Sequence, residues 1–220
     1  MCFSATASFA AAAVVGGVGV VTLREAVRSG HRRLLPIAAF PMLFAAQQLV
    51  EGLLWLDLFR TEPGTCRPFL THAFLAYAEV FWPVFAPLAV WLIEPARWRR
   101  RVMLVCLGIG TALGGYLLFK MIANPYTASV VDEHIVYGNG VAYPRGIEIP
   151  YVLATTISLL LSSHRMIQLL AAVILMGFGV AYVSFHASYI SVWCFFAAVA
   201  SVLVYLFVSR APSTKQWRKL

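Results

Sequence analysis

The chain has 220 residues, of which 61% are hydrophobic and 12% are charged, and its mean hydropathy is +0.80. A water-soluble fold cannot cover that much apolar surface, so the composition excludes a soluble globular protein. The net charge of +8 does not indicate nucleic-acid binding, because the basic residues stand in short clusters between apolar runs, where they act as topology signals. The lipid bilayer is therefore the expected partner.

Apolar runs about 18 to 22 residues long match a hydrocarbon core about 30 Å thick at about 1.5 Å of rise per helical residue. They predict an all-α, polytopic bundle, with seven helices favoured and six or eight as alternatives, because the fifth run is short and the last turn is tight. The predicted spans are 5–23, 36–58, 70–93, 102–122, 149–163, 166–186 and 188–208. They form one transmembrane domain, 1–210, followed by a basic tail, 211–220. No signal peptide is expected before the first span.

The basic residues fall mostly on one side of the predicted bundle. Segments 24–33, 97–101 and 210–219, together with Arg165, carry most of the 17 Lys and Arg residues, whereas the opposite connections carry few. The positive-inside rule therefore places the N-terminus outside and the C-terminus in the cytoplasm. Two outer segments, 57–68 and 124–150, are long enough to be lids or binding elements, and a disordered connector is an equal alternative.

The second and third spans carry polar residues in their outer halves. A carboxylate near the bilayer centre costs at least ~2.5 kcal/mol, so Glu51 and Glu79 are expected to face the bundle interior or a wet cavity. Gln47 and Glu51 are four residues apart and share a helix face, beside a stripe that contains Gln48 and Trp55. The inner half of the bundle contains no comparable set, which predicts a polar pocket that opens outward.

Two histidines extend this predicted pocket. His72 and Glu79 are seven residues apart and share one face, and His186 lies near the outer end of the sixth span. The predicted ligand-binding residues are Gln47, Gln48, Glu51, Trp55, His72, Glu79 and His186. Structural roles compete with this interpretation, since buried amides often bridge helices and interfacial histidines are often solvated. Lys120 is expected to extend to the headgroups.

A divalent metal is an alternative occupant of the pocket. Two imidazoles and two carboxylates suit zinc or iron, and the set would be Glu51, His72, Glu79 and His186. No His-x-x-x-His or Glu-x-x-His pair occurs, so these ligands would have to converge from different helices. Cys2 and Cys66 both fall on the outer side, where either a disulfide or free thiols are consistent with the sequence.

Four stretches of the sequence resemble a family: MCFSATASF at the start, LPIAAFPMLFAAQQLVEGLLWL (35–56), FWPVFAPLAVWLIEP (81–95) and SVWCFFAA (191–198). Together they resemble a bacterial family of multi-span membrane proteins known only as a domain of unknown function. The resemblance covers most of the chain and implies a multi-pass protein of the bacterial cytoplasmic membrane. It brings no activity, cofactor or partner. The positions that match its motifs are Cys2, Gln47, Gln48, Glu51, Gly52, Trp55, Trp82 and Pro83.

Two functions remain open at this stage. The first is the binding or transport of a small ligand, proton or cation by the outward pocket. The second is a membrane-embedded hydrolase that activates a metal-bound water, although the last span lacks the His-x-x-x-His pair of the seven-helix hydrolases. A light sensor of the microbial rhodopsin kind is excluded, because span 188–208 contains no lysine for a Schiff base. The sequence assigns no catalytic residue and no oligomeric state.

Overall fold

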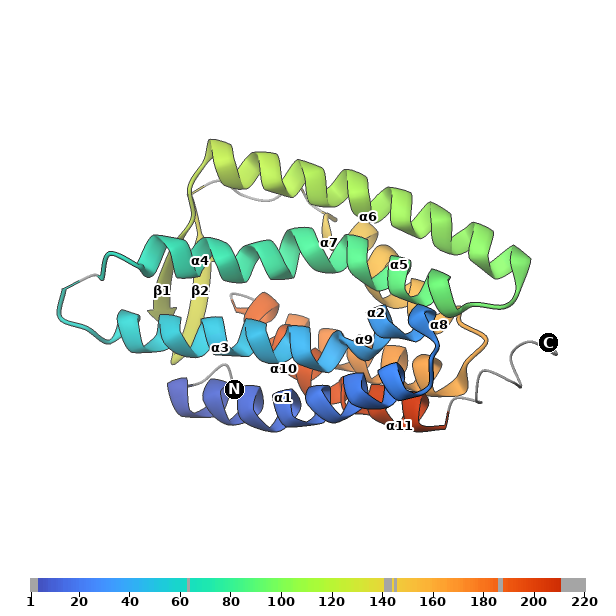
Figure 1. The fold of residues 1–220 in the computed structure, drawn as a ribbon. Coiled ribbons are helices and arrows are strands. Elements are labelled where there is room, and N and C mark those ends of the chain that lie inside the picture. The colour runs from blue at the N-terminus through green and yellow to red at the C-terminus, as the bar shows by residue number, and fades with distance from the viewer. Residues whose placement is uncertain (1–3, 63, 141–143, 145, 186–187, 211–220) are drawn as a thin grey trace.

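The structure, a computed structural model, describes residues 4–62, 64–140, 144, 146–185 and 188–210, and helices dominate it (Figure 1). Within these ranges six helical segments are long and apolar enough to cross a membrane. They are Ala5–Arg28, Arg32–Leu58, Arg67–Ile93, Arg97–Ala123, Arg165–Ser184 and Tyr189–Ser209. A further apolar segment, Glu148–Leu160, is shorter. Each of the seven predicted spans thus has a helical counterpart, which confirms the predicted all-α membrane-type bundle.

The short segment corresponds to the predicted fifth span. At about 1.5 Å of rise per residue it is about 20 Å long, which is less than the ~30 Å of a hydrocarbon core. A seventh full crossing of the membrane therefore stays a prediction.

Several spans consist of consecutive elements, because prolines and π-helical turns interrupt them. The elements of the first half are α1 (Ala5–Arg28), η1 (Arg32–Leu34), α2 (Leu35–Ala38), α3 (Phe40–Leu58), α4 (Arg67–Leu75), η2 (Ala76–Phe81), α5 (Trp82–Ile93) and α6 (Arg97–Ala123). The remaining elements are β1 (Thr127–Val131), β2 (His134–Gly138), α7 (Glu148–Val152), η3 (Leu153–Ile157), α8 (Ser158–Leu160), α9 (Arg165–Ser184), α10 (Tyr189–Ala200) and α11 (Leu203–Ser209).

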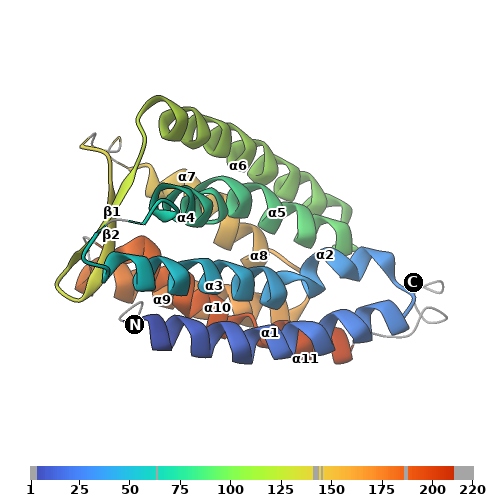
Figure 2. The same cartoon turned by 60° about the vertical axis from the view of Figure 1, so that its left-hand side comes forward.

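The helices form two groups, which the turned view separates (Figure 2). In one group α6 lies along α5 and η2 and covers α7 and η3. In the other group α1 lies along α3 and also contacts α10 and α11, while α9 packs against α10. The largest buried cluster joins the groups through an aromatic stack in which Phe44 lies 3.9 Å from Trp82, measured between ring centroids.

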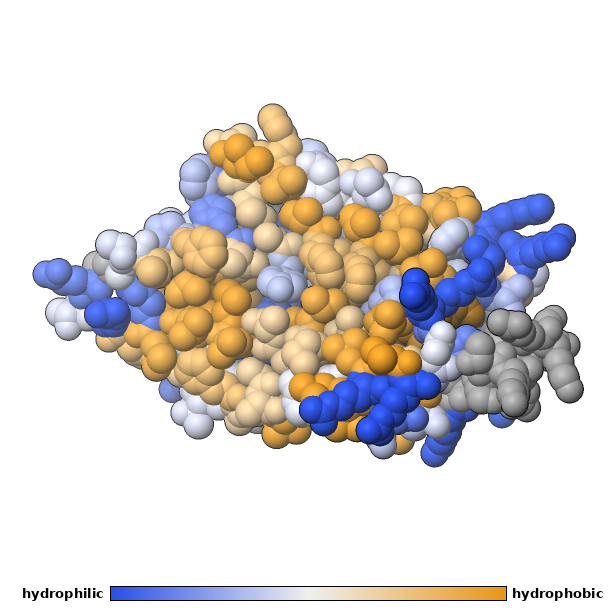
Figure 3. Space-filling model, viewed as in Figure 1, coloured by the Kyte–Doolittle hydropathy of each residue, from blue (hydrophilic) through white to orange (hydrophobic). Residues whose placement is uncertain are grey.

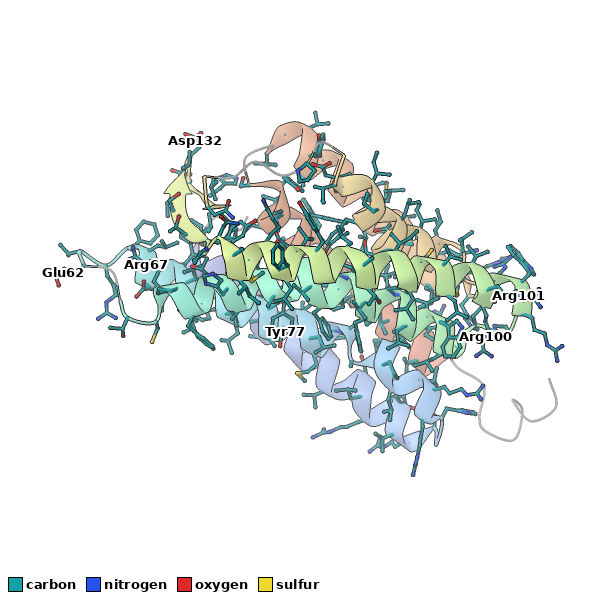
Figure 4. All side chains as sticks on the ribbon, turned by 90° about the horizontal axis from the view of Figure 1, so that it is seen from above. Glu62, Arg67, Tyr77, Arg100, Arg101 and Asp132 are labelled. Atoms are coloured by element: carbon teal, nitrogen blue, oxygen red, sulfur yellow. The ribbon has the colours of Figure 1, made fainter. Side chains whose placement is uncertain are left out.

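The bundle has two chemically different ends. We call the end that contains the loop 59–66 and the strands β1 and β2 the hairpin end, and the end that contains the connections 29–31, 94–96 and 161–164 the arginine end. Figure 3 shows hydrophobic side chains between the two ends and hydrophilic ones gathered at them. Figure 4 shows Glu62 and Asp132 at the hairpin end and Arg100 and Arg101 at the other. This asymmetry supports the predicted orientation, which remains a prediction.

The segment after α6 contains an antiparallel hairpin that the sequence did not predict. Its register pairs Thr127 with Gly138 and Val131 with His134. Asp132 and Glu133 form the two-residue turn, and both have positive φ angles, 48° and 62°. Turns of this kind usually contain Asn or Gly, so the local sequence gave little sign of a hairpin.

The hairpin packs against α3 and α4 at the hairpin end of the bundle. Ile135 is fully buried and belongs to a cluster with Leu54 and Trp55 of α3. Tyr137 stacks on Phe74 of α4 with a centroid distance of 4.9 Å. The segment 124–138 is therefore a packed cover over the hairpin end.

The loop between α3 and α4 is closed by an ion pair. Arg67 donates from Nε to Asp57 Oδ2 and from Nη2 to the Asp57 carbonyl, each at 2.6 Å, and Asp57 is buried. We expect Arg67→Ala to lower the free energy of unfolding by about 1.5–3 kcal/mol, the usual worth of a hydrogen bond to a charged group. Thermal unfolding in detergent measures this loss. The control is Arg60→Ala, whose side chain is exposed, and an equal loss in both variants would contradict the proposed closure.

Candidate functional site

The predicted polar stripe of α3 lies inside the bundle. Gln47, Gln48 and Glu51 have no exposed surface, and Trp55 is 1% exposed. Their spacing places them on the side of α3 that faces α5, α10 and the hairpin, because residues three and four apart lie on the same side of a helix. The burial agrees with the expectation that these residues avoid lipid.

Hydrogen bonds join two polar groups of this stripe to other helices. Ser191 of α10 donates its hydroxyl hydrogen to Glu51 Oε1, and Gln48 Nε2 donates to Glu51 Oε2 at 3.3 Å. Gln47 Oε1 accepts from Trp82 Nε1 of α5 at 2.8 Å. The stripe therefore links α3 to α5 and α10 and holds Glu51 in a fixed position.

Trp55 lies on the same helix as Glu51, but its side chain packs against the hairpin. Its ring packs in the cluster that contains Ala128 and Ile135 of the strands. It also stacks on Phe59, with 5.5 Å between the ring centroids. Trp55 thus joins the outer end of α3 to the cover above it.

Glu79 lies in the π-helical segment η2 and is 5% exposed. The irregular turn has a local cause: Pro83 has no N–H for the carbonyl of residue 79, and its ring collides with that carbonyl in a regular α-helix. Wider π turns often occur at functional sites, because they redirect a side chain from its regular helical position.

Glu79 lines a cavity of about 40 Å³ in the half of the bundle nearer the hairpin end. The polar side chains that share this cavity are Glu148, Tyr151, Tyr189 and Cys194. Glu79 and Cys194 therefore share one lining, whereas Glu51 is not part of it. Space for a water molecule requires about 10–15 Å³, and the cavity therefore accommodates a few waters or one small ion.

A second π-helical segment, η3, follows α7 and contacts α5 and α6. Tyr151, just before η3, donates its hydroxyl hydrogen to the carbonyl of Ala78 in η2. Thr155 Oγ1 in turn donates to the Tyr151 carbonyl at 2.8 Å. The Tyr151 hydroxyl thus ties α7 to η2 at the wall of the cavity.

The structure does not bring His72 to Glu79. His72 Nε2 accepts from the backbone N–H of Tyr126 at 3.3 Å, so Nδ1 carries the proton that bonds to the Pro68 carbonyl at 2.6 Å. Both ring nitrogens are engaged, and the ring fixes the segment that enters the hairpin. Lys120 is half-buried at the outer end of α6, and His186 and Cys2 lie outside the described residues.

Over the part of the chain that the structure describes, no group of three or more His, Cys, Asp or Glu side chains is arranged to hold a metal ion. Glu51 and Glu79 come from two different helical segments, whereas His72 bonds to the segment that enters the hairpin. Cys66 is exposed in the loop of the hairpin end. The predicted metal set therefore gains no support from the described side chains.

A second buried carboxylate site lies at the arginine end, where the sequence predicted none. Glu94 is 3% exposed, and its oxygens accept from Ser163 N at 2.7 Å, Ser163 Oγ at 2.5 Å and Ala96 N at 3.1 Å. Sequence reasoning missed it because a Glu before a proline at the end of a span is typical of a solvated charge. Glu148, Tyr151, Tyr189 and Ser191 were missed as well, since no local spacing indicates which helices they meet.

Comparison with known proteins concerns the whole chain. A family model described as a family of unknown function, DUF6629, matches residues 1–219. No curated protein and no solved structure matches the chain. The matched region contains every helix of the bundle, the hairpin and the two buried carboxylates near Cys194, and it confirms the resemblance noted in the sequence. The chain belongs to DUF6629, a family of unknown function.

Proposed function

We propose that this membrane protein binds, and transfers across the membrane, a proton or a small cation through the cavity beside Glu79. The observation that carries the proposal is a buried carboxylate, Glu79, in the wall of a small cavity that also contacts Tyr151 and Tyr189. The proposal places the hairpin end outside a bacterial cytoplasmic membrane, as the distribution of arginines favours.

The two buried carboxylates lie inside helices of membrane-spanning length, where a charge is costly. An acidic side chain at the centre of a membrane helix costs about 2.5–3.5 kcal/mol on insertion scales, so its retention indicates an ion pathway or a proton relay more often than packing. Glu51 and Glu79 both lie inside membrane-type helices, and both interact with Cys194. Two buried carboxylates inside the bundle favour a positively charged occupant.

The size of the cavity narrows the choice of ligand. Pockets for organic ligands usually have volumes of about 300–1,000 Å³, and this cavity has about 40 Å³. The oxygens of carboxylates and hydroxyls also suit hard cations. Glu148 lines the same cavity and is only partly buried, which supports access from the hairpin end.

The residues have distinct roles under this proposal. Glu79 accepts the proton or contacts the cation, and the Tyr189 hydroxyl offers a further oxygen at the cavity wall. Tyr151 holds the wall in place through its bond to Ala78. Glu51, fixed by Ser191 and Gln48, adds negative charge from the neighbouring helix.

The test is ion flux into proteoliposomes that contain a pH-sensitive dye, with parallel tracer assays for Na⁺, K⁺, Mg²⁺ and Ca²⁺. We expect the wild type to pass protons or one of these cations above the rate of empty liposomes. Glu79→Gln should abolish the flux and Glu51→Gln should reduce it, because each removes a charge near the cavity while keeping the side-chain volume. Glu62→Gln, at an exposed carboxylate in the outer loop, is the matched control.

Two outcomes would contradict the proposal. One is a well-folded wild type that passes no proton or tested cation. The other is a flux that Glu79→Gln and Glu62→Gln leave equally intact, since the exposed carboxylate has no part in the proposed path.

A further inference from the structure

A larger cavity, about 620 Å³, lies at the arginine end of the bundle. Three connections meet around it: the segment between α1 and α2, the corner between α5 and α6, and the turn between α8 and α9. Its polar lining consists of His31, Arg33, Glu94, Arg100, Ser163 and His164. This volume lies within the usual range of ligand pockets, about 300–1,000 Å³.

The carboxylate in this cavity is already engaged by donors of its own. Glu94 accepts from Ser163 and from the backbone N–H of Ala96, so it fastens the α5–α6 corner to the turn before α9. Among the described residues, no salt bridge joins Arg33 or Arg100 to a carboxylate. Two guanidinium groups therefore line the cavity without an anionic partner from these parts of the chain.

One of these guanidinium groups is held in position by an aromatic ring. The Arg100 guanidinium carbon lies 4.4 Å from the centre of the Trp91 ring, a cation–π contact that leaves the N–H edges available. The imidazole of His164 is placed by its contact between Nε2 and the Ile93 carbonyl at 3.2 Å. The cavity therefore contains the positioned guanidinium of Arg100 and a second arginine, Arg33, from the segment between α1 and α2.

We infer that this cavity binds a phosphate group. Arginine presents N–H donors in a planar fork that matches phosphate oxygens, and the His31 imidazole belongs to the same lining. The same chemistry is offered by an anionic lipid headgroup and by a soluble phosphate compound. The inference is independent of the proposed ion pathway, because it concerns different residues at the opposite end of the bundle.

The competing explanation for phosphate binding is attraction to the general positive charge of the arginine end. A matched pair of double variants distinguishes binding in the cavity from this general attraction. Arg33→Gln/Arg100→Gln removes two charges from the cavity. Arg97→Gln/Arg101→Gln removes two charges from exposed positions on the same end, outside the cavity lining. Neighbouring residues such as Arg100 and Arg101, both labelled in Figure 4, point about 100° apart around a helix.

The experiment measures thermal unfolding of the full-length protein in neutral detergent at fixed ionic strength. The probes are inorganic phosphate and dioleoyl phosphatidic acid, and dioleoyl phosphatidylcholine is the lipid control. We expect a saturable rise in the unfolding temperature of the wild type, with an apparent Kd that increases about tenfold or more in the cavity pair and less than about twofold in the exposed pair.

The two probes distinguish the two sources of phosphate. Stabilisation by phosphatidic acid alone assigns the site to a lipid headgroup, and stabilisation by inorganic phosphate as well assigns it to a soluble compound. No saturable stabilisation by either probe, or equal weakening in the two variant pairs, overturns the inference. If the cavity pair does not fold, Arg33→Gln alone decides the same question, because Arg33 is exposed and lies outside the buried core cluster.

Discussion

Gly110→Ala is expected to destabilise the bundle by about 3 kcal/mol, the upper part of the range for overpacking a buried site. Gly110 lies on α6 where it faces α5, and a Cβ atom there would be 1.8 Å from the Pro83 carbonyl oxygen and 2.7 Å from its carbon. The obstacle is backbone, so no side-chain rotation relieves it. The Pro83 carbonyl approaches α6 because Pro87, four residues later, has no N–H to bond it. Relief therefore requires α5 and α6 to separate.

The same helix offers a matched control for this prediction. Gly108→Ala adds the same methyl group two residues away, where nothing lies within 4 Å. We expect this variant to retain or slightly raise the unfolding temperature, because Ala favours a helix by up to about 1 kcal/mol over Gly. Thermal unfolding in detergent compares the two directly. Equal unfolding temperatures would show that α5 and α6 do not pack as described.

Glu94→Ala is expected to cost about 3 kcal/mol or more. The substitution leaves Ser163 N–H and the Ser163 hydroxyl without their acceptor, and a hydrogen bond to a charged group is worth about 1.5–3 kcal/mol. Because Glu94 ties the α5–α6 corner to the turn before α9, the loss should loosen the arginine end as a whole.

Two further variants check the origin of this effect. Ser163→Ala removes the hydroxyl bond and keeps the N–H bond to Glu94, so we expect a smaller loss than in Glu94→Ala. Glu62→Ala, at an exposed carboxylate, should leave the unfolding temperature unchanged. A Glu94→Ala protein as stable as Glu62→Ala would refute the structural role of the buried carboxylate.

The helices could be predicted because each depends on a local property, the length of an apolar run. The predicted span 102–122 nevertheless begins five residues later than α6, which starts at Arg97. The arginines lie outside the hydrocarbon core, but their backbone still forms helical hydrogen bonds. Hydropathy therefore locates the apolar part of a helix and not its end. The hairpin was not predicted, since its turn residues, Asp132 and Glu133, are unusual at positive φ.

The candidate site was predictable only within single helices. The burial of Gln47, Gln48 and Glu51 follows from their spacing on α3, but Ser191 comes from a helix 140 residues later in the chain. The predicted common face of His72 and Glu79 assumed a regular helix between them. The π-helical segment η2 changes that relation, because its wider turns rotate the residues that follow.

The most direct test of the ion-binding proposal is infrared difference spectroscopy of the carboxyl groups in the purified protein. We expect a carboxyl band that changes with pH or on addition of Na⁺, K⁺, Mg²⁺ or Ca²⁺. This band should be absent from the spectrum of Glu79→Gln and present in that of Glu62→Gln. A spectrum that none of these additions alters, or a band that persists in Glu79→Gln, would contradict the proposed role of the buried carboxylate.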